Sequence, residues 1–257
     1  MPSSLLTPYI QCFWVMQSET SLQSTAPNRI LPDGCVDIII NMGDPFLEMD
    51  ADTSDINDEK VYIVGAMQTP ILIGMMGHVD VIGIRFKPGG AFPFFGFPIN
   101  TITDRSIPLD DVWSGISSTM NSRMPEQTTI RSKTSILEDL LLKRLGTFPV
   151  LDALTLEAIR IIYKKDGLVS IRTISQNLNI TGRHLERKFL KHVGISPKML
   201  CRIVRLQYAL SHLKKQHNPI WTYIVYKSGY YDQAHFIKEF KILTGLSPNA
   251  YLNEKIL

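Results

Sequence analysis

Hydrophobic residues in the first hundred positions fall in short runs separated by turn residues. The runs are Ile10–Met16, Val36–Asn41, Val61–Ala66, Ile71–Met76 and Val79–Phe86. Short apolar runs bounded by glycine, proline and aspartate are typical of strands in a β-sandwich or barrel. The pattern therefore predicts a β-rich regulatory or sensor domain over residues 1–106. The aspartate-rich stretch Glu48–Lys60 is expected to be a solvated loop or disordered tip.

The period of the hydrophobic positions changes after residue 107. Leu137, Leu141 and Leu145 recur at a spacing of four within a helix expected from Ile130 to Leu145. We therefore predict a helical connector over residues 107–148. Its apolar stripe is consistent either with packing in a core or with a dimerisation seam, and the sequence leaves both open.

From residue 149 to the end the pattern is helical, and one part of it occurs twice. A shift of 51 positions places Phe189 on Phe240, Gly194 on Gly245, and Ser196-Pro197 on Ser247-Pro248. Glycine ends helices in the left-handed conformation, and serine followed by proline begins them. The same short helical unit is therefore predicted twice.

Each copy has the spacing of a helix-turn-helix unit. In the first, a helix ends at Leu178, a three-residue turn follows, and Thr181 can cap a second helix whose outer face is polar. The units are predicted at about 170–193 and 220–243, joined by a long helix over Pro197–Leu213. The alternative is a helical bundle that merely uses the same caps twice, which leaves the polar outer faces unexplained.

Charge is divided unevenly along the chain. Residues 1–151 contain 10 Lys+Arg and 17 Asp+Glu, a net charge of −7, whereas residues 152–257 contain 17 and 7, a net charge of +10. A basic C-terminal domain is suited to a polyanion such as DNA. Docking of the basic domain on an acidic N-terminal one would give the same split.

The second copy carries a recognisable signature: Gly229-Tyr230-Tyr231-Asp232-Gln233-Ala234-His235-Phe236, then Phe240-Lys241, then Gly245-Leu246-Ser247-Pro248. With this signature, residues 149–257 resemble the DNA-binding domain of the AraC-type (AraC/XylS) transcriptional regulators. The resemblance implies an α+β protein: a β-rich sandwich or barrel, a helical connector, and an all-α domain with two helix-turn-helix units joined by a long helix. It also implies a sequence-specific regulator that reads two adjacent major-groove segments.

Base-reading positions carry over from the family by place in each recognition helix. They are Arg183, Glu186 and Arg187 in the first unit and Gln233, Ala234 and Lys238 in the second. Arginine can pair with guanine, glutamine with adenine, and glutamate can accept from cytosine. We expect the phosphate contacts to come from Arg172, Lys188, Lys191, Lys227 and Lys241.

The N-terminal half of such regulators usually senses a small molecule or mediates dimerisation. Trp14, Asp37, Arg85 and Phe86 are candidates to line a ligand pocket, in which Arg85 would hold an anionic group. The competing interpretation is that Asp37 and Arg85 form a structural ion pair and that the aromatic residues are core. In that case the N-terminal half only dimerises.

Other classes of function find little support. The whole chain has three scattered cysteines, and residues 1–151 have a single histidine, His78. We therefore predict no metal site, no cofactor and no enzymatic activity. The sequence shows no signal peptide and no apolar run long enough to cross a membrane, so we expect a cytoplasmic location. The expected partners are double-stranded DNA, a small-molecule effector, a second copy in a homodimer, and RNA polymerase if the protein is an activator.

Overall fold

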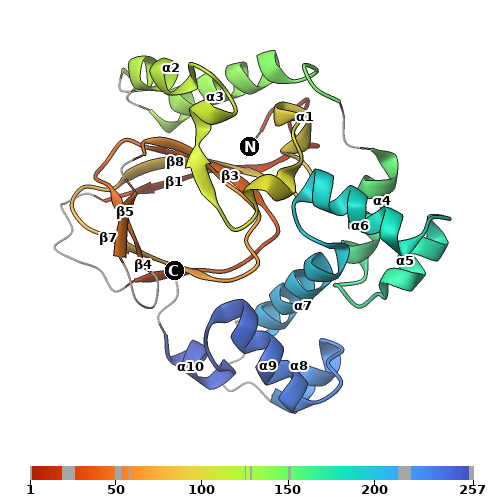
Figure 1. The fold of residues 1–257 in the computed structure, drawn as a ribbon. Helices are drawn as coiled ribbons and strands as arrows, with labels where there is room; N and C mark the ends of the chain where they lie inside the picture. Colours follow the sequence, from red (N-terminus) through yellow and green to blue (C-terminus); the bar gives the residue numbers. More distant parts are fainter. Residues whose placement is uncertain are drawn as a thin grey trace.

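The computed structural model describes residues 2–18, 27–49, 54–57, 59–124, 126–127, 129–149, 152–213 and 221–254. A β-rich N-terminal part lies beside a helical C-terminal part (Figure 1). The expected α+β class, with a β-rich N-terminal region and a helical C-terminal region, is confirmed. No helix within the described ranges is both long enough and apolar enough to cross a bilayer.

The N-terminal part contains two antiparallel sheets. The five-stranded sheet has the order β1-β8-β3-β6-β9, with bounds Ile10–Gln17, Asp80–Phe86, Val36–Asn41, Val61–Val64 and Ser106–Pro108. The four-stranded sheet has the order β2-β7-β4-β5, with bounds Asn28–Ile30, Ile71–Met75, Phe46–Met49 and Ser54–Asn57. The predicted apolar runs thus form β1, β3, β6, β7 and β8.

The five-stranded sheet has two different faces because side chains alternate along a strand. Ile38 and Ile84 point to one face and enter a large core that helices cover. Asp37 comes just before Ile38 on β3, and Arg85 comes just after Ile84 on β8. Both therefore point to the other face, toward the four-stranded sheet. This alternation decides which side chains can reach a ligand between the sheets.

Short helices cover the outer face of the five-stranded sheet (Figure 1). They are α1 (Phe92–Phe95), η1 (Ile99–Ile102), η2 (Leu109–Asp111), α2 (Ile116–Arg123) and α3 (Ile130–Arg144). Leu137 and Leu141 of the predicted stripe are buried in the same core as the sheet, and Leu145 packs against it. The stripe is therefore part of the core. The domain boundary at residue 106 stays a prediction, as does any dimerisation role of the connector.

The expectation of a loop or a disordered tip over Glu48–Lys60 is wrong for part of that stretch, because β4 extends to Met49 and β5 occupies Ser54–Asn57. Residues 50–53 and 58 of the stretch lie outside the described residues. β5 pairs with β4, which in turn pairs with β7. Pairing with a neighbouring strand outweighs the low strand propensity of aspartate and asparagine in this stretch.

The described residues of the C-terminal part form helices joined by turns. Its helices are α4 (Ala153–Lys164), α5 (Ile171–Asn177), α6 (Gly182–Val193), α7 (Pro197–Leu213), α8 (Trp221–Lys227), α9 (Gln233–Thr244) and α10 (Pro248–Asn253). The long helix α7 supplies Leu200, Ile203 and Leu206 to a core that includes Phe189 of α6 and Phe240 of α9. One core therefore holds both copies of the repeated unit on a shared helix.

Candidate DNA-binding interface and inter-sheet cavity

The repeated unit forms a capped helix-turn-helix in both copies. Thr181 accepts a hydrogen bond from the His184 amide at the start of α6, and Asp232 accepts one from the His235 amide at the start of α9. Gly194 and Gly245 end these helices with φ values of 96° and 75°. The caps predicted at Thr181, Gly194 and Gly245 are confirmed, and the N-caps Thr181 and Asp232 lie 51 residues apart.

The first recognition helix, α6, presents a polar face to solvent. Arg183, Glu186 and Arg187 are exposed, while Leu185 and Phe189 are buried in the core. The Arg187 guanidinium lies 3.1 Å from Nδ1 of His184. An open hollow lies over Arg183, Glu186, Arg187, Leu190 and Lys191, and Pro98 and Asn100 of the N-terminal part also line it. Guanidinium and carboxylate groups on one open face can form directional hydrogen bonds to base edges.

The second recognition helix, α9, presents the equivalent face with different chemistry. Its open hollow lies over Ala234, Ile237, Lys238, Lys241 and Ile242. Each of these five residues lies 51 positions after one of the five α6 residues that line the first hollow. Gln233 is exposed at the first helical position. The sequence-based set for this unit omitted Ile237, although the shift of 51 from Glu186 indicates it.

The cations expected to bind phosphate occupy different environments. Arg172, Lys191, Lys227 and Lys241 are exposed. Lys188 instead lies on the flank of α6, where its Nζ is 3.1 Å from Oδ1 of Asp152. Lys191 Nζ lies 5.6 Å from the ring centroid of Phe92, and Lys227 Nζ lies 5.7 Å from that of Tyr223. Lys188 is therefore committed to an internal ion pair, and the other four side chains are accessible to a backbone phosphate.

Charged contacts fix the second unit to the bridging helix. Arg202 of α7 binds both carboxylate oxygens of Glu239 on α9, at 2.6 and 3.1 Å. The Arg205 guanidinium lies 5.2 Å from the ring centroid of Tyr230. A bidentate arginine–carboxylate pair restricts rotation as well as separation, so α9 has a defined orientation on α7.

A buried histidine links α6 to the start of α4. His192 Nδ1 lies 3.0 Å from Oδ2 of Asp152 and 3.0 Å from the hydroxyl of Thr155. Its ring packs edge-on against Phe92 of the N-terminal part, with centroids 4.5 Å apart. Burial lowers the pKa of His192, and the charge of Asp152 offsets part of that effect. The neutral form of His192 is therefore the one that this junction favours.

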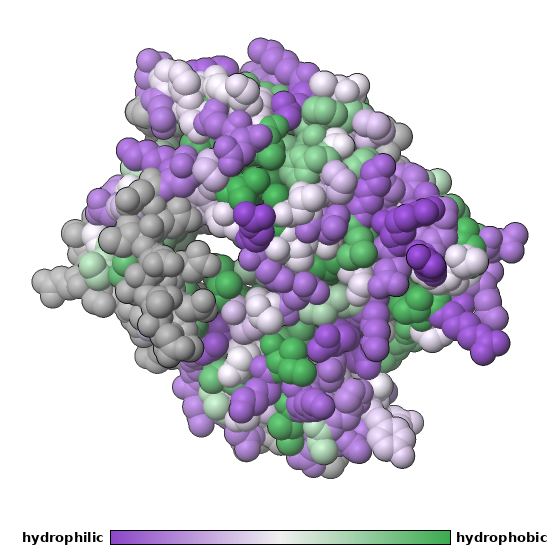
Figure 2. All heavy atoms as spheres, viewed as in Figure 1, coloured by the Kyte–Doolittle hydropathy of each residue, from purple (hydrophilic) through white to green (hydrophobic). Residues whose placement is uncertain are grey.

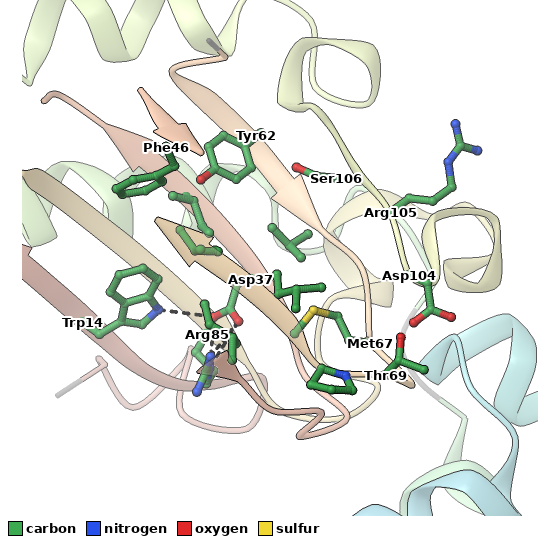
Figure 3. A pocket seen from close by; sticks show the side chains of 16 residues that line it. Trp14, Asp37, Phe46, Tyr62, Met67, Thr69, Arg85, Asp104, Arg105 and Ser106 are labelled. Atoms are coloured by element: carbon green, nitrogen blue, oxygen red, sulfur yellow. Dashed lines mark hydrogen bonds and ion pairs between the residues drawn. The ribbon is translucent and has the colours of Figure 1, made fainter. Parts of the chain in front are cut away.

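A cavity of about 290 Å³ lies between the two sheets. Its walls come from both: Trp14, Ile39 and Tyr62 from the five-stranded sheet, and Phe46 and Ile73 from the four-stranded one. Figure 3 shows Trp14, Asp37 and Arg85 grouped at one end and Asp104 at another, with the Arg105 side chain directed away from the centre. The volume is close to the lower end of the range for small-molecule pockets.

Arg85 is enclosed by two carboxylates. Its Nε and one terminal nitrogen bind Asp37 at 3.1 and 2.9 Å, and its other terminal nitrogen lies 3.0 Å from Asp33. The indole of Trp14 donates to Asp37 at 3.3 Å. Burial raises the pKa of Asp37, and the hydrogen bonds from Arg85 oppose that rise. The pKa of Arg85 is raised: burial lowers it, but the hydrogen bonds and charge of Asp37 outweigh this.

The four residues predicted to contact a ligand do not all line the cavity. Trp14, Asp37 and Arg85 line the cavity, but Phe86 is fully buried on the opposite face of β8. Asp37 and Arg85 form the structural ion pair that the competing interpretation anticipated. Placement of Phe86 in the pocket is therefore wrong, because adjacent residues of a strand point to opposite faces.

The cysteines lack the environment of a nucleophile. Cys12, Cys35 and Cys201 are all free thiols. Burial raises the pKa of Cys35 well above its ordinary value and raises that of Cys201 to about 11. Because the thiolate is the reactive form, the raised pKa values of Cys35 and Cys201 leave little of that form near neutral pH.

Segments that border the cavity contact the C-terminal ends of α6 and α10. The hydroxyl of Thr103 donates a hydrogen bond to the Gly194 carbonyl at 2.7 Å, and Thr103 adjoins the lining residues Asp104 and Arg105. Arg29, next to the lining residue Ile30, binds both oxygens of Glu254 at 3.0 and 3.1 Å. The cavity wall is thus continuous with the attachment points of α6 and α10.

Comparison with known proteins assigns a class to the helical part. Residues 174–254 match a family described as a helix-turn-helix domain. The chain is therefore a helix-turn-helix DNA-binding protein of the transcription-regulator class. Its C-terminal domain is of the AraC type, as the repeated signature indicated. Residues 1–108 match a domain of unknown function (DUF6597), and no curated protein matches the chain.

Solved structures resemble the chain at low sequence identity. ToxT from Vibrio cholerae is 15% identical, with 95% of this chain and 98% of that one covered and a TM-score of 0.47. ToxT from Vibrio cholerae with unsaturated fatty acid bound is 18% identical, with 95% and 96% covered and a TM-score of 0.44. The C-terminal domain of AraT, a response regulator from Geobacillus stearothermophilus, is 27% identical, with 42% and 89% covered and a TM-score of 0.38.

Proposed function

We propose that this protein reads two adjacent major-groove segments of DNA with α6 and α9, and that a small molecule in the inter-sheet cavity regulates it. The observation that carries the first part is the pair of capped helices with equivalent exposed faces. A single recognition helix covers only a few base pairs, so many helix-turn-helix proteins dimerise to place two helices one turn apart. Here α7 joins both units in one chain.

The base-reading assignments follow from the exposed groups. Arg183 and Arg187 suit guanine, Glu186 suits the cytosine amino group, and Gln233 suits adenine. Lys238 can donate to a base or to a phosphate, and Ala234 offers only an apolar contact. Arg172, Lys191, Lys227 and Lys241 remain our assignments to phosphate, whereas the ion pair of Lys188 with Asp152 argues for a structural role.

Footprinting of the full-length protein on a selected duplex tests the two-segment arrangement. We expect a monomer to protect two successive major grooves on one face of the DNA, and we expect a five-base-pair insertion between them to abolish binding because it rotates one segment by half a turn. The variants Arg187→Ala and Lys238→Ala should each weaken protection of a different groove. Protection of a single groove, or binding only by a dimer to a symmetric site, would contradict the proposal.

Two attachments support regulation through the cavity. The segment with Thr103 holds the end of α6, and the strand with Arg29 holds α10, which follows α9. A ligand that changes the separation of the two sheets would change how the two units are held relative to each other. Such a ligand shifts the balance between conformations by its difference in affinity for them.

The charges in the cavity restrict the kind of ligand. Arg85 is already shared by Asp33 and Asp37, so an anionic ligand would have to displace a carboxylate from it. The remaining walls are largely apolar, with Trp14, Ile39 and Phe46 among them. A neutral, mainly apolar molecule with a hydrogen-bonding group fits this arrangement better than the anion that the sequence suggested.

Thermal unfolding of the full chain with a metabolite panel tests the ligand. Binding to the folded state raises the unfolding temperature by mass action. The variant Ile39→Phe, which fills the cavity, should lose the shift, whereas Ile161→Phe on α4, outside the cavity, should keep it. No shift across broad classes of metabolites would favour the alternative that the N-terminal half only dimerises.

A further inference from the structure

The face of α9 that corresponds to the DNA-reading face of α6 carries exposed apolar side chains. Ile237 is 39% exposed and Ala234 is exposed beside it, one helical turn earlier. Their counterparts 51 residues earlier are Glu186 and Arg183, which are charged. The scaffold is the same in both units, so the difference concerns what the face contacts rather than how the helix packs.

The surroundings of Ile237 are cationic. Lys238 and Lys241 lie on the same open face. The acidic residue nearest to them on α9, Glu239, is bound to Arg202. Figure 2 shows hydrophobic surface mixed with hydrophilic surface over the helical C-terminal half. An apolar patch framed by lysines is complementary to a polyanion that offers apolar groups of its own.

Base edges in the major groove offer one such group. Guanine, cytosine and adenine present only hydrogen-bond donors and acceptors there, whereas thymine adds the C5 methyl. Packing Ile237 or Ala234 against a polar edge would leave a base donor or acceptor desolvated and without a partner, which is unfavourable. Contact with a thymine methyl avoids this and buries apolar surface on both sides.

We infer that Ala234 and Ile237 make the second recognition helix a reader of thymine methyl groups. The inference rests on the proposed function, because it requires α9 to enter the major groove. It gives the two DNA segments different compositions: guanine and cytosine opposite α6, and thymine opposite α9. It also adds Ile237 to the residues that determine specificity.

Replacement of thymine by uracil tests the inference, because uracil lacks only the C5 methyl. A duplex selected from a random pool by the full-length protein should contain thymine in the segment that faces α9. Uracil at those positions should weaken binding about four-fold for each methyl contact, the factor expected for one buried methylene-sized group. Ile237→Ala should bind the thymine duplex more weakly and lose sensitivity to uracil at its contact.

The control is Glu186→Ala, which changes the same position of the other helix. This variant should keep the full uracil penalty in the α9 segment and relax the base preference opposite α6. A selected duplex without thymine in the α9 segment, or one whose affinity is unchanged by uracil, would overturn the inference and leave two-segment reading intact. Failure to select any duplex would overturn the proposed function itself.

Discussion

Three exposed side chains on each recognition helix differ in chemistry, while the positions beneath them are apolar in both. Leu185 and Phe189 in α6 correspond to Phe236 and Phe240 in α9, and all four are fully buried. The outer positions change from Arg183, Glu186 and Arg187 to Ala234, Ile237 and Lys238. Buried positions must be apolar and closely packed in both copies, whereas exposed ones are free to differ with the bases that they contact.

Arg187 offers the clearest test of a base contact. Arg187→Ala should weaken binding to the selected duplex about five-fold or more, because a bidentate arginine–guanine pair contributes about 1–3 kcal/mol of discrimination. Binding to random duplex should change little. Arg172→Ala, our phosphate assignment, should weaken both equally. Titration of both duplexes at one salt concentration gives the comparison, and an equal loss for Arg187→Ala would make it a phosphate contact.

Gly83 of β8 leaves room for the indole of Trp14. A Cβ atom built there would lie 2.1 Å from the Trp14 ring. Gly83→Ala should therefore displace Trp14 from the cavity end and lower the free energy of unfolding by about 1–3 kcal/mol, the usual cost of overpacking. Gly182→Ala, whose added carbon would meet its neighbours only at 3.9 Å, is the matched control and should be close to neutral. Urea unfolding measures both, and equal stabilities would contradict this packing.

Sequence patterns predicted most of the helices and strands but missed one strand pair. The β3 run and the helix α7 have the bounds expected from hydrophobic spacing, and Thr181 and Asp232 cap α6 and α9. The β4–β5 pair was missed because the aspartates in and around β5 favour loops, and pairing of β4 with both β5 and β7 makes strands favourable there. Local propensity cannot report such pairing.

Helix α9 depends on its N-cap as well as on its core. The Asp232 carboxylate accepts from the His235 amide at 2.7 Å. Asp232→Ala should lower the free energy of unfolding by about 1 kcal/mol, since it removes the partner of an amide at the helix start. Asp232→Asn retains an accepting oxygen and should recover most of that loss. Equal stabilities of the two variants in urea unfolding would show that the cap is not responsible.

The two halves of the molecule are joined at several charged or polar points. Thr103 contacts Gly194, Arg29 pairs with Glu254, and Phe92 packs on His192. None of these pairings follows from spacing along the chain, because the partners lie far apart in sequence. The division of charge indicated that the two halves have opposite net charge. It left open whether the basic half binds DNA or docks on the acidic half.

His192 makes the stability of this junction depend on pH. Burial lowers its pKa in the folded protein, so the unfolded chain binds the proton more readily. Its contribution to stability is complete above about pH 6.5, the ordinary histidine value, and is lost as the pH falls toward the lower folded pKa. The unfolding free energy should therefore fall between pH 7.5 and 5.5, and His192→Gln should reduce that fall. An unchanged fall would assign the pH dependence to other groups.

Selection of DNA from a random pool by the full-length protein tests the central claim most directly. At a salt concentration that suppresses binding through phosphate alone, we expect a single asymmetric motif with two segments about one helical turn apart. One segment should be rich in guanine and cytosine and the other should contain thymine. Failure to enrich any sequence would contradict the account of this chain as a protein that reads DNA with two different helices.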